Sequence, residues 1–472
     1  MKRKWGQLLG VILEGSILAG CGRAPEATQS PTADGGTEPS RTAWTENEES
    51  TGSGQSAAGE EFVGGEQLAG SEESTGDERL AGSGEPAGNG QPAAEDATGW
   101  NREDSGDVDA LRDFSWQLMT ENTEQENPIL SPVSAYLALG MVGMGAQGET
   151  EDEFRELLGG NMPAVSQRLM ERYPREQEGM TLAIANSVWM DEQLVPKEQW
   201  IGDIESIFLG ENRRGILSSE KVMEQINGWC SENTRGLVPK MLDMPLAVDT
   251  RLVLLDAVYF KGDWLVPFEA VNTSQRPFTR EDGTEKQVDT MSMSDTKQRY
   301  LHSDLGEGVL LPYQGEDFAY VAILPREGME VRELQRQLTP EALAELLGSE
   351  NRELCNLRLP KYEVSFDREL NDSLQAMGLV RAFDGERADF SGLEKTEQRS
   401  SLYLSLVKQK AVFRVDEKGT EAAAVTMAVM DRCAAIISPQ PRELYFDRPF
   451  VYMILDTETQ VPLFAGIMDD PS

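Results

Sequence analysis

The chain has 472 residues, of which 82 are acidic, 43 are basic and one is histidine, and its formal net charge is −39. This charge excludes a duplex-binding protein, because such proteins neutralise phosphates with an excess of Lys and Arg. The single histidine, His302, cannot supply a metal site with two or three histidine ligands, and its polar surroundings are typical of a surface loop. We therefore expect no enzyme activity, no metal and no cofactor.

The N-terminus has the pattern of an export signal. A basic start, Met1-Lys2-Arg3-Lys4, precedes an apolar stretch from Leu8 to Ala19 that is too short to cross a bilayer as a helix. The stretch ends in Leu18-Ala19-Gly20-Cys21, which resembles the bacterial lipoprotein signal, in which the cysteine takes a diacylglyceryl group and the chain is cut before it. The resemblance implies a signal peptide over 1–20, lipidation of Cys21 and an exported protein, either anchored by its lipid to a bacterial membrane at the cell surface or extracellular.

Residues 21–106 are predicted to be the lipidated cysteine and a disordered acidic tether. Residues 22–106 hold 18 acidic and 4 basic side chains, for a net charge of −14, and almost no large apolar ones. Such a segment cannot bury enough apolar surface to offset the entropy of ordering it. Random-coil scaling gives the tether a mean reach of roughly 50 Å, and repulsion between like charges extends it further.

The remaining residues, 107–472, have a net charge of −27 and globular patterns without a linker, which predicts one large α+β domain. Thr150 and Glu153 predict a capping box for a helix over 151–158. Cys230 and Cys355 are expected to be small core residues. The apolar patterns predict helices at 107–119, from Ser131-Pro132 onward, 222–234 and 339–348, and strands at 182–189, 252–260, 308–325 (two strands) and 357–366.

Ten short motifs along 107–472 resemble the serpin family in order and approximate spacing. They are Asn127-Pro-Ile-Leu-Ser-Pro-Val-Ser134, Ala185-Asn186, Ile226-Asn227-Gly-Trp-Cys230, Tyr259-Phe-Lys-Gly-Asp-Trp264, Leu311-Pro-Tyr313, Leu359-Pro-Lys361, Ala388-Asp-Phe-Ser-Gly392, Asp416-Glu-Lys-Gly-Thr-Glu-Ala-Ala-Ala424, Asp447-Arg-Pro-Phe450 and Leu463-Phe-Ala-Gly466. The resemblance implies an α+β serpin fold with three β-sheets, eight to nine helices and an exposed reactive loop, in a chain that is expected to be monomeric.

In that family the reactive loop is bait for a peptidase. The peptidase cuts the loop and forms an acyl-enzyme, and the freed segment then inserts as a strand into the large sheet. The resemblance therefore implies an inhibitor of serine-type endopeptidases whose partner is the peptidase. Two alternatives stay open: a non-inhibitory binding protein of serpin fold on the cell surface, and an inhibitor of cysteine peptidases.

Insertion constrains the segment after Asp416, because side chains alternate between the faces of a strand. Counted from Thr420, the inward side chains through Ala428 are all small and uncharged, and Gly419 supplies backbone freedom at the hinge. The resemblance assigns the loop hinge to Glu417, Gly419, Thr420, Glu421, Ala422, Ala423, Ala424 and Thr426.

Two positions of the cut bond are compatible with the family's spacing. The common spacing from Gly419 gives Cys433–Ala434, which suits elastase-like, chymotrypsin-like or some cysteine peptidases. A spacing one residue shorter gives Arg432–Cys433, which suits trypsin-like peptidases. An exposed Cys433 is also compatible with a redox-sensitive loop.

Five further residues match positions that open the sheet in serpins. Trp264 matches the point where opening starts, and the other four match polar residues under the centre of the sheet: Ser131, Ser134, Asn186 and Gln409. The family often has histidine in place of Gln409, and glutamine keeps the hydrogen bonds without titrating near neutral pH. Asp256 stands where the family commonly has asparagine.

Overall fold

The computed structural model describes residues 7–15, 105–395, 402–420 and 440–471. Contacts divide the chain into two units, one containing residues 1–19 and 95–472 and the other containing residues 20–94. The second unit lies outside the described residues, so the tether and the lipidation of Cys21 stay predictions.

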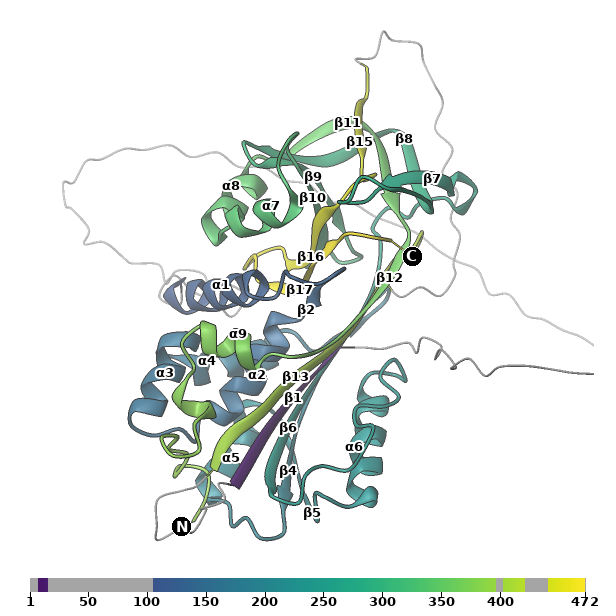
Figure 1. Ribbon diagram of the computed structural model, residues 1–472. Coiled ribbons are helices and arrows are strands. Elements are labelled where there is room, and N and C mark those ends of the chain that lie inside the picture. Colours follow the sequence, from purple (N-terminus) through teal and green to yellow (C-terminus); the bar gives the residue numbers. More distant parts are fainter. Residues whose placement is uncertain (1–6, 16–104, 396–401, 421–439, 472) are drawn as a thin grey trace, which may run out of the picture. The chain divides into compact units, whose positions relative to one another are not determined.

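One eight-stranded sheet holds the site described below (Figure 1). Its strands follow the order β1 (Gln7–Gly15), β13 (Leu402–Val415), β14 (Gly419–Thr420), β6 (Thr250–Asp263), β4 (Met180–Asp191) and β3 (Arg175–Gln177), with β12 (Tyr362–Glu369) on β13 and β5 (Glu211–Gly215) on β4. β6 is buried along nearly its whole length, as expected for a strand that is covered on both faces.

A second network of nine strands contains two sheets that share the long strand β8 (Glu285–Ser303). The first residues of β8, 285–290, pair with β7 (Ser274–Thr279), and residues 290–300 pair with β11 (Asn351–Pro360), which in turn pairs with β15 (Arg442–Tyr445). The last residues of β8 pair with β9 (Gly306–Pro312). From β9 the order continues through β10 (Phe318–Pro325), β16 (Phe450–Asp456), β17 (Pro462–Met468) and β2 (Ile129–Leu130).

Nine α-helices lie among the described residues. They are α1 (Ser105–Thr120), α2 (Pro132–Gly143), α3 (Glu149–Leu158), α4 (Met162–Arg172), α5 (Glu198–Ile207), α6 (Glu220–Asn233), α7 (Val331–Gln337), α8 (Pro340–Gly348) and α9 (Asn371–Ala376). The predicted α+β fold with three sheets and eight to nine helices is confirmed.

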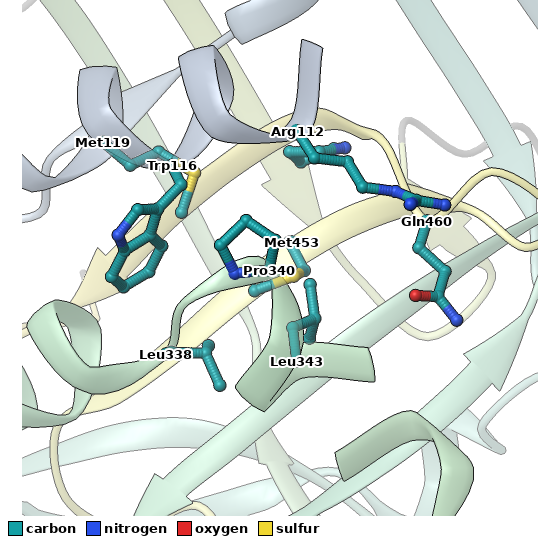
Figure 2. Close-up of a pocket in the computed structure, with 9 residues that line it drawn as sticks. Arg112, Trp116, Met119, Leu338, Pro340, Leu343, Met453 and Gln460 are labelled. Atoms are coloured by element: carbon teal, nitrogen blue, oxygen red, sulfur yellow. The ribbon is translucent and has the colours of Figure 1, made fainter. Parts of the chain in front are cut away.

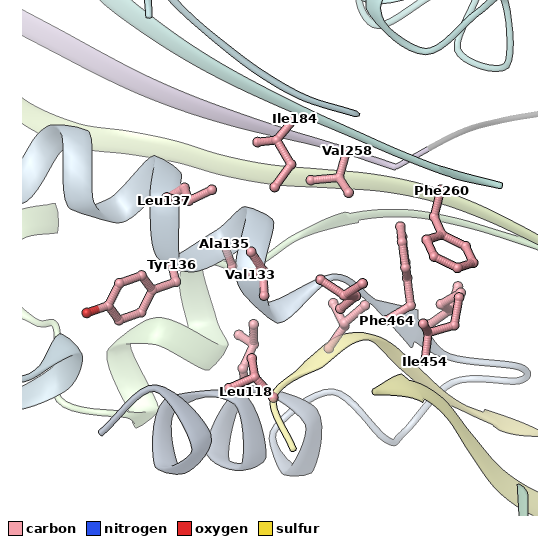
Figure 3. Packing of buried hydrophobic residues seen from close by; sticks show 14 of the residues in the cluster. Leu118, Val133, Ala135, Tyr136, Leu137, Ile184, Val258, Phe260, Ile454 and Phe464 are labelled. Carbon is pink, nitrogen blue, oxygen red and sulfur yellow. The ribbon is translucent and has the colours of Figure 1, made fainter. Parts of the chain in front are cut away.

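Helix α2 forms the centre of the main core. All of its residues are buried, which follows from a sequence that is apolar on every side, and Pro132 starts it without losing a helical hydrogen bond. Figure 3 shows Val133 and Leu137 of α2 packed toward Ile184 and Val258 of the eight-stranded sheet. The helix therefore supports this sheet from beneath.

Two local predictions were wrong. Helix α3 begins after Gly148, and the side chains of Thr150 and Glu153 accept hydrogen bonds from the backbone N–H groups of Asp389 and Arg381, so they form no capping box. The strand predicted at 357–366 is two strands, β11 and β12, which belong to different sheets and meet at Lys361. Alternating hydrophobicity does not reveal such a change of sheet. Cys230 and Cys355 are free and buried, as predicted.

The apolar stretch predicted to be the core of a signal peptide contains strand β1 in this structure of the full chain. β1 runs parallel to β13 and to β6, between which it lies. Removal of residues 1–20, which the signal predicts, would leave this position in the sheet empty. None of the helices within the described ranges is long and apolar enough to span a membrane.

Candidate functional site

The predicted hinge is already part of the eight-stranded sheet. In β14, Thr420 pairs with Val415 of β13 on one side and with Gly262 of β6 on the other, and both pairings are antiparallel. β13 and β6 therefore meet at this end through two residues of the hinge. A strand that continued from Thr420 in the same direction would run between β13 and β6.

Residue 419 must be glycine, because its backbone lies very close to that of β6. Its φ is 156°, and a Cβ atom at this position would collide with the carbonyl oxygen of Gly262. Any other residue would push the hinge away from β6, because the obstructing atom belongs to the backbone of a central strand. Glycine is therefore needed here for space as well as for backbone freedom.

Thr420 points into the core and is only 3% exposed. Its hydroxyl shares a hydrogen bond of 2.7 Å with the hydroxyl of Tyr313. The ring of Tyr313 stacks on that of Trp264, with centroids 4.7 Å apart. Burial raises the pKa of Tyr313 well above its usual value, so the phenol stays neutral and can donate. The inward direction of Thr420 in an inserted strand stays a prediction.

Trp264 and the residues after it hold the hinge backbone. The backbone N–H of Trp264 donates to the carbonyl of Lys418 at 2.7 Å, and its indole N–H donates to the carbonyl of Asp416 at 2.9 Å. The backbone N–H of Phe268 donates to the carbonyl of Glu417 at 2.8 Å. These three bonds fix residues 416–418, which must move if the sheet opens here.

The side chain of Glu417 adds a charged contact to the hinge. Its carboxylate accepts hydrogen bonds from Thr273 at 2.8 Å and from Lys361 at 3.0 Å. Burial alone would raise the pKa of Glu417, but the bonds from Lys361, its own backbone and Thr273 outweigh burial and hold this pKa below the usual value. Glu417 is therefore a charged anchor at neutral pH.

The polar residues under the sheet form one direct link between β13 and α2. Gln409 of β13 accepts from the backbone N–H of Ser131 at 3.1 Å and donates to its carbonyl at 3.0 Å. Ser134 is buried in α2, and its hydroxyl has no hydrogen-bond partner among the described residues. Asn186 instead donates to the carbonyl of Phe208 at 2.8 Å, and its Cα partner on β6 is the buried Asp256.

The rest of the predicted loop falls outside the described residues. This applies to Glu421, Ala422, Ala423, Ala424 and Thr426 of the hinge and to Arg432, Cys433 and Ala434 around the cut bond. These assignments stay predictions.

Three residues of the site were not predicted as such: Tyr313, Thr273 and Lys361. Tyr313 and Lys361 stand in two of the motifs that resemble serpins, Leu311-Pro-Tyr313 and Leu359-Pro-Lys361, and this was the available signal. No comparable signal marked Thr273.

Two cavities lie elsewhere among the described residues, and they differ greatly in size. The apolar cavity lined by Trp116, Met119, Leu343 and Met453 (Figure 2) has a volume of about 20 Å³, which is close to the space that one water needs. A larger cleft of about 930 Å³ beside His302 is open to solvent and has charged residues of both signs in its wall.

Comparison with known proteins agrees with this geometry. Residues 109–471 match the family model described as serpin (serine protease inhibitor). The chain is 32% identical to Iripin-8 of Ixodes ricinus over 363 residues, which is 73% of this chain and 88% of that protein. It is also 32% identical to serpin B6 of Macaca fascicularis over 361 residues, covering 73% of this chain and 94% of that one.

Solved structures show the same fold. The native state of the thermophilic serpin tengpin superposes with a TM-score of 0.72 at 28% identity, covering 80% of this chain and 97% of tengpin. Thyroxine-binding globulin in complex with thyroxine superposes with a TM-score of 0.67 at 26% identity, covering 77% of this chain and 99% of that one.

Proposed function

Because the chain belongs to the serpin family, we propose that it inhibits serine-type endopeptidases by offering its loop as bait. The hydroxyl of the peptidase serine attacks the carbonyl of Cys433, or of Arg432, and the peptide bond to the next residue breaks. The serine proton passes through the peptidase histidine to the leaving amine, and an ester joins the two proteins. The freed segment then enters the sheet before water can cleave that ester.

The observation that carries this proposal is the position of β14 between β13 and β6. Gly419 and Thr420 have the direction, the neighbours and the inward orientation of the first residues of an inserted strand. Residues 421–428 would continue that strand, and their inward members, Ala422, Ala424, Thr426 and Ala428, are all small enough to pack under a sheet.

The place of β1 in the sheet also supports the proposal, because it is a position between β13 and β6 that can hold a strand. Eight of its nine residues pair with β13 on one side and eight pair with β6 on the other. Once residues 1–20 are removed, the same position is left to the loop. The link between Gln409 and Ser131 is present with β1 in this position, where Leu13 is the Cα partner of Gln409, so a strand can occupy the position without breaking it.

The direct test is to incubate the chain without residues 1–20, in which β1 no longer occupies this position, with elastase-like, chymotrypsin-like and trypsin-like peptidases. A complex that survives denaturing electrophoresis supports the proposal, and a peptidase whose serine is replaced by alanine is the control that must form none. The mass of the released C-terminal peptide identifies the bond. Complete cleavage of the loop without any trapped peptidase would refute inhibition.

Thr420→Arg tests insertion separately from cleavage. An arginine in the position of a side chain that is 3% exposed cannot enter the core, so we expect cleavage to continue and the trapped fraction to fall at least tenfold. The matched control is Glu421→Arg, because alternation directs residue 421 to the other face. Equal losses in both variants would contradict the proposed direction of insertion.

We also propose that the protein acts outside the cytoplasm as a lipoprotein. The sequence before Cys21 and the tether over 21–106 support this, since a tether would hold the inhibitor away from the membrane. Labelling cells with a radioactive fatty acid should mark the wild-type protein and leave Cys21→Ala unlabelled. Labelling of both proteins would show that Cys21 is not the lipidated residue.

A further inference from the structure

The sheet that contains the first strand after the loop carries cations that form no ion pair with a described carboxylate. β15 is the first strand after the loop, and its neighbours in order are β11 and β8, with β7 on the other side of β8. The side chains of Cys355, Leu357 and Leu359 on β11 are buried on one face of this sheet. By alternation, Arg352 and Arg358 on the same strand lie on the opposite face.

Two more cations lie on that opposite face. Lys297 of β8 is the Cα partner of Leu354, which has the same orientation on β11 as Arg358. Arg276 of β7 is the Cα partner of Val288 on β8. Val288 is four positions before Ser292, so by alternation the two have the same orientation on β8, and Ser292 is the Cα partner of Arg358. We call Arg276, Lys297, Arg352 and Arg358 the cationic face.

No carboxylate among the described residues forms an ion pair with any member of the cationic face. The guanidinium carbon of Arg358 lies 3.9 Å from the centroid of the Tyr445 ring, which holds this cation flat on the sheet. Arg276, Lys297 and Arg352 are exposed. Other cations of these strands are neutralised: Arg299 pairs with Glu350 at 2.6 Å and Lys286 with Asp470 at 3.0 Å.

Unpaired positive charge is unexpected in a chain whose net charge is −39. The carboxylate on the same face of β15 is Glu443, which is the Cα partner of Asn356. Positive side chains thus outnumber negative ones on this face, although acidic residues are nearly twice as numerous in the whole chain. A partner with negative charge would be attracted here and repelled by most of the remaining surface.

The cationic face lies where a peptidase bound to the loop must sit. Arg442, the first residue of β15, follows Cys433 by nine positions, and a chain of this length spans at most about 30 Å when extended. A small domain is itself about 30 Å across. A peptidase that holds Cys433 in its active site is therefore close enough for its surface to reach β15 and β11.

We propose that the cationic face is a second contact surface for the target peptidase, and that this peptidase carries acidic side chains beside its active site. The proposal rests on the proposed function, because the partner is the peptidase that cuts the loop. Complementary charges of this kind mainly accelerate association, so the face would select among peptidases that share one specificity for the bond.

The test is the double variant Arg276→Glu with Arg358→Glu in the full chain. An anionic and a cationic peptidase of the same primary specificity are used, and the second-order rate constant for loop cleavage is measured. We expect a fall of about tenfold with the anionic enzyme at low salt and a rise with the cationic one. Both effects should vanish near 1 M salt, where the screening length is about 3 Å.

The matched control is Lys221→Glu with Arg336→Glu, which makes the same change of charge on α6 and α7 at exposed cations that also form no ion pair with described residues. Equal effects in both double variants would overturn the proposal, because only net charge would then matter. A faster reaction of the first variant with the anionic enzyme would overturn it too.

Failure of this proposal is separable from failure of inhibition. Loop cleavage is counted whether it ends in a covalent complex or in released peptidase. If the wild-type chain is cut without trapping, the proposed inhibition fails, and the cleavage rates of the two double variants still decide whether the cationic face contacts the peptidase.

Discussion

At the scale of single residues, the hinge depends on a few contacts between distant parts of the chain. Thr420 and Tyr313 are 107 positions apart and share one buried hydrogen bond. Gly419 fits only because no side chain separates it from Gly262. The start of the loop is therefore held by specific contacts, and each can be removed by a single substitution.

Tyr313→Phe removes the hydroxyl that bonds Thr420 and leaves the ring on Trp264. We expect a loss of about 1 kcal/mol in the free energy of unfolding and faster hydrogen exchange in residues 416–420. The control is Tyr320→Phe, which removes a bond of 2.9 Å to Tyr362 and should leave exchange at the hinge unchanged. Identical exchange in both variants would argue against a role of Tyr313 in holding the loop.

Glu417 makes the hinge sensitive to acid. Its pKa in the folded chain is lower than in the unfolded chain, where it is about 4.3. Its stabilising effect is thus complete above the unfolded value and is lost as the pH falls through the folded value. We expect Glu417→Gln to lower the free energy of unfolding at pH 7, with a difference from the wild-type chain that shrinks on acidification. A difference for Glu417→Gln that stays constant on acidification would contradict the prediction.

At the scale of elements, an ion pair joins the end of α4 to the end of β16. Arg172 donates to both carboxylate oxygens of Asp456, at 2.8 and 3.1 Å, and the two side chains are 9% and 1% exposed. A second carboxylate, that of Glu458, accepts from Arg172 at 2.8 Å. The pair ties a helix beneath one sheet to a strand of another.

Asp456→Asn removes the buried carboxylate and leaves Arg172 with the more exposed carboxylate of Glu458, so it should cost up to about 3–5 kcal/mol in urea unfolding. Replacing both residues, as Arg172→Met with Asp456→Leu, should cost less, because the charge that is then left without its partner, that of Glu458, is partly exposed to water. A double variant that is no more stable than Asp456→Asn would mean that the bonds of Arg172, and not its burial, dominate the loss.

The helices and strands also show how much of the fold could be predicted from the sequence. Apolar periodicity predicted α1, α2, α6, α8 and the central strands, because burial of one face leaves a period in the sequence. It missed the change of sheet at Lys361, since both strands alternate in the same way. Gly419 and Thr420 could be assigned from their motif, whereas Thr273 could not, because its contact with Glu417 spans 144 positions and follows no local pattern.

At the scale of the whole molecule, the proposed function requires a native chain that is less stable than its cleaved form. Cleavage lets residues after Thr420 pair with β13 on one side and with β6 on the other. We therefore expect the melting temperature of the chain without residues 1–20 to rise by more than 10 °C after the loop is cut, as measured by circular dichroism. The melting temperature of Thr420→Arg should rise much less when its loop is cut. An unchanged melting temperature of the wild-type chain after cleavage would rule out insertion.

The length of β13 determines how far a trapped peptidase would be moved. Its 14 residues span about 46 Å, so a peptidase joined to the end of a strand inserted alongside would be drawn through most of that distance. The movement would happen once and would not reverse, because the inserted strand gains hydrogen bonds on both edges that it would have to lose in order to leave the sheet. Protection would then depend on the number of molecules displayed and not on turnover, and each encounter would remove one of them from service.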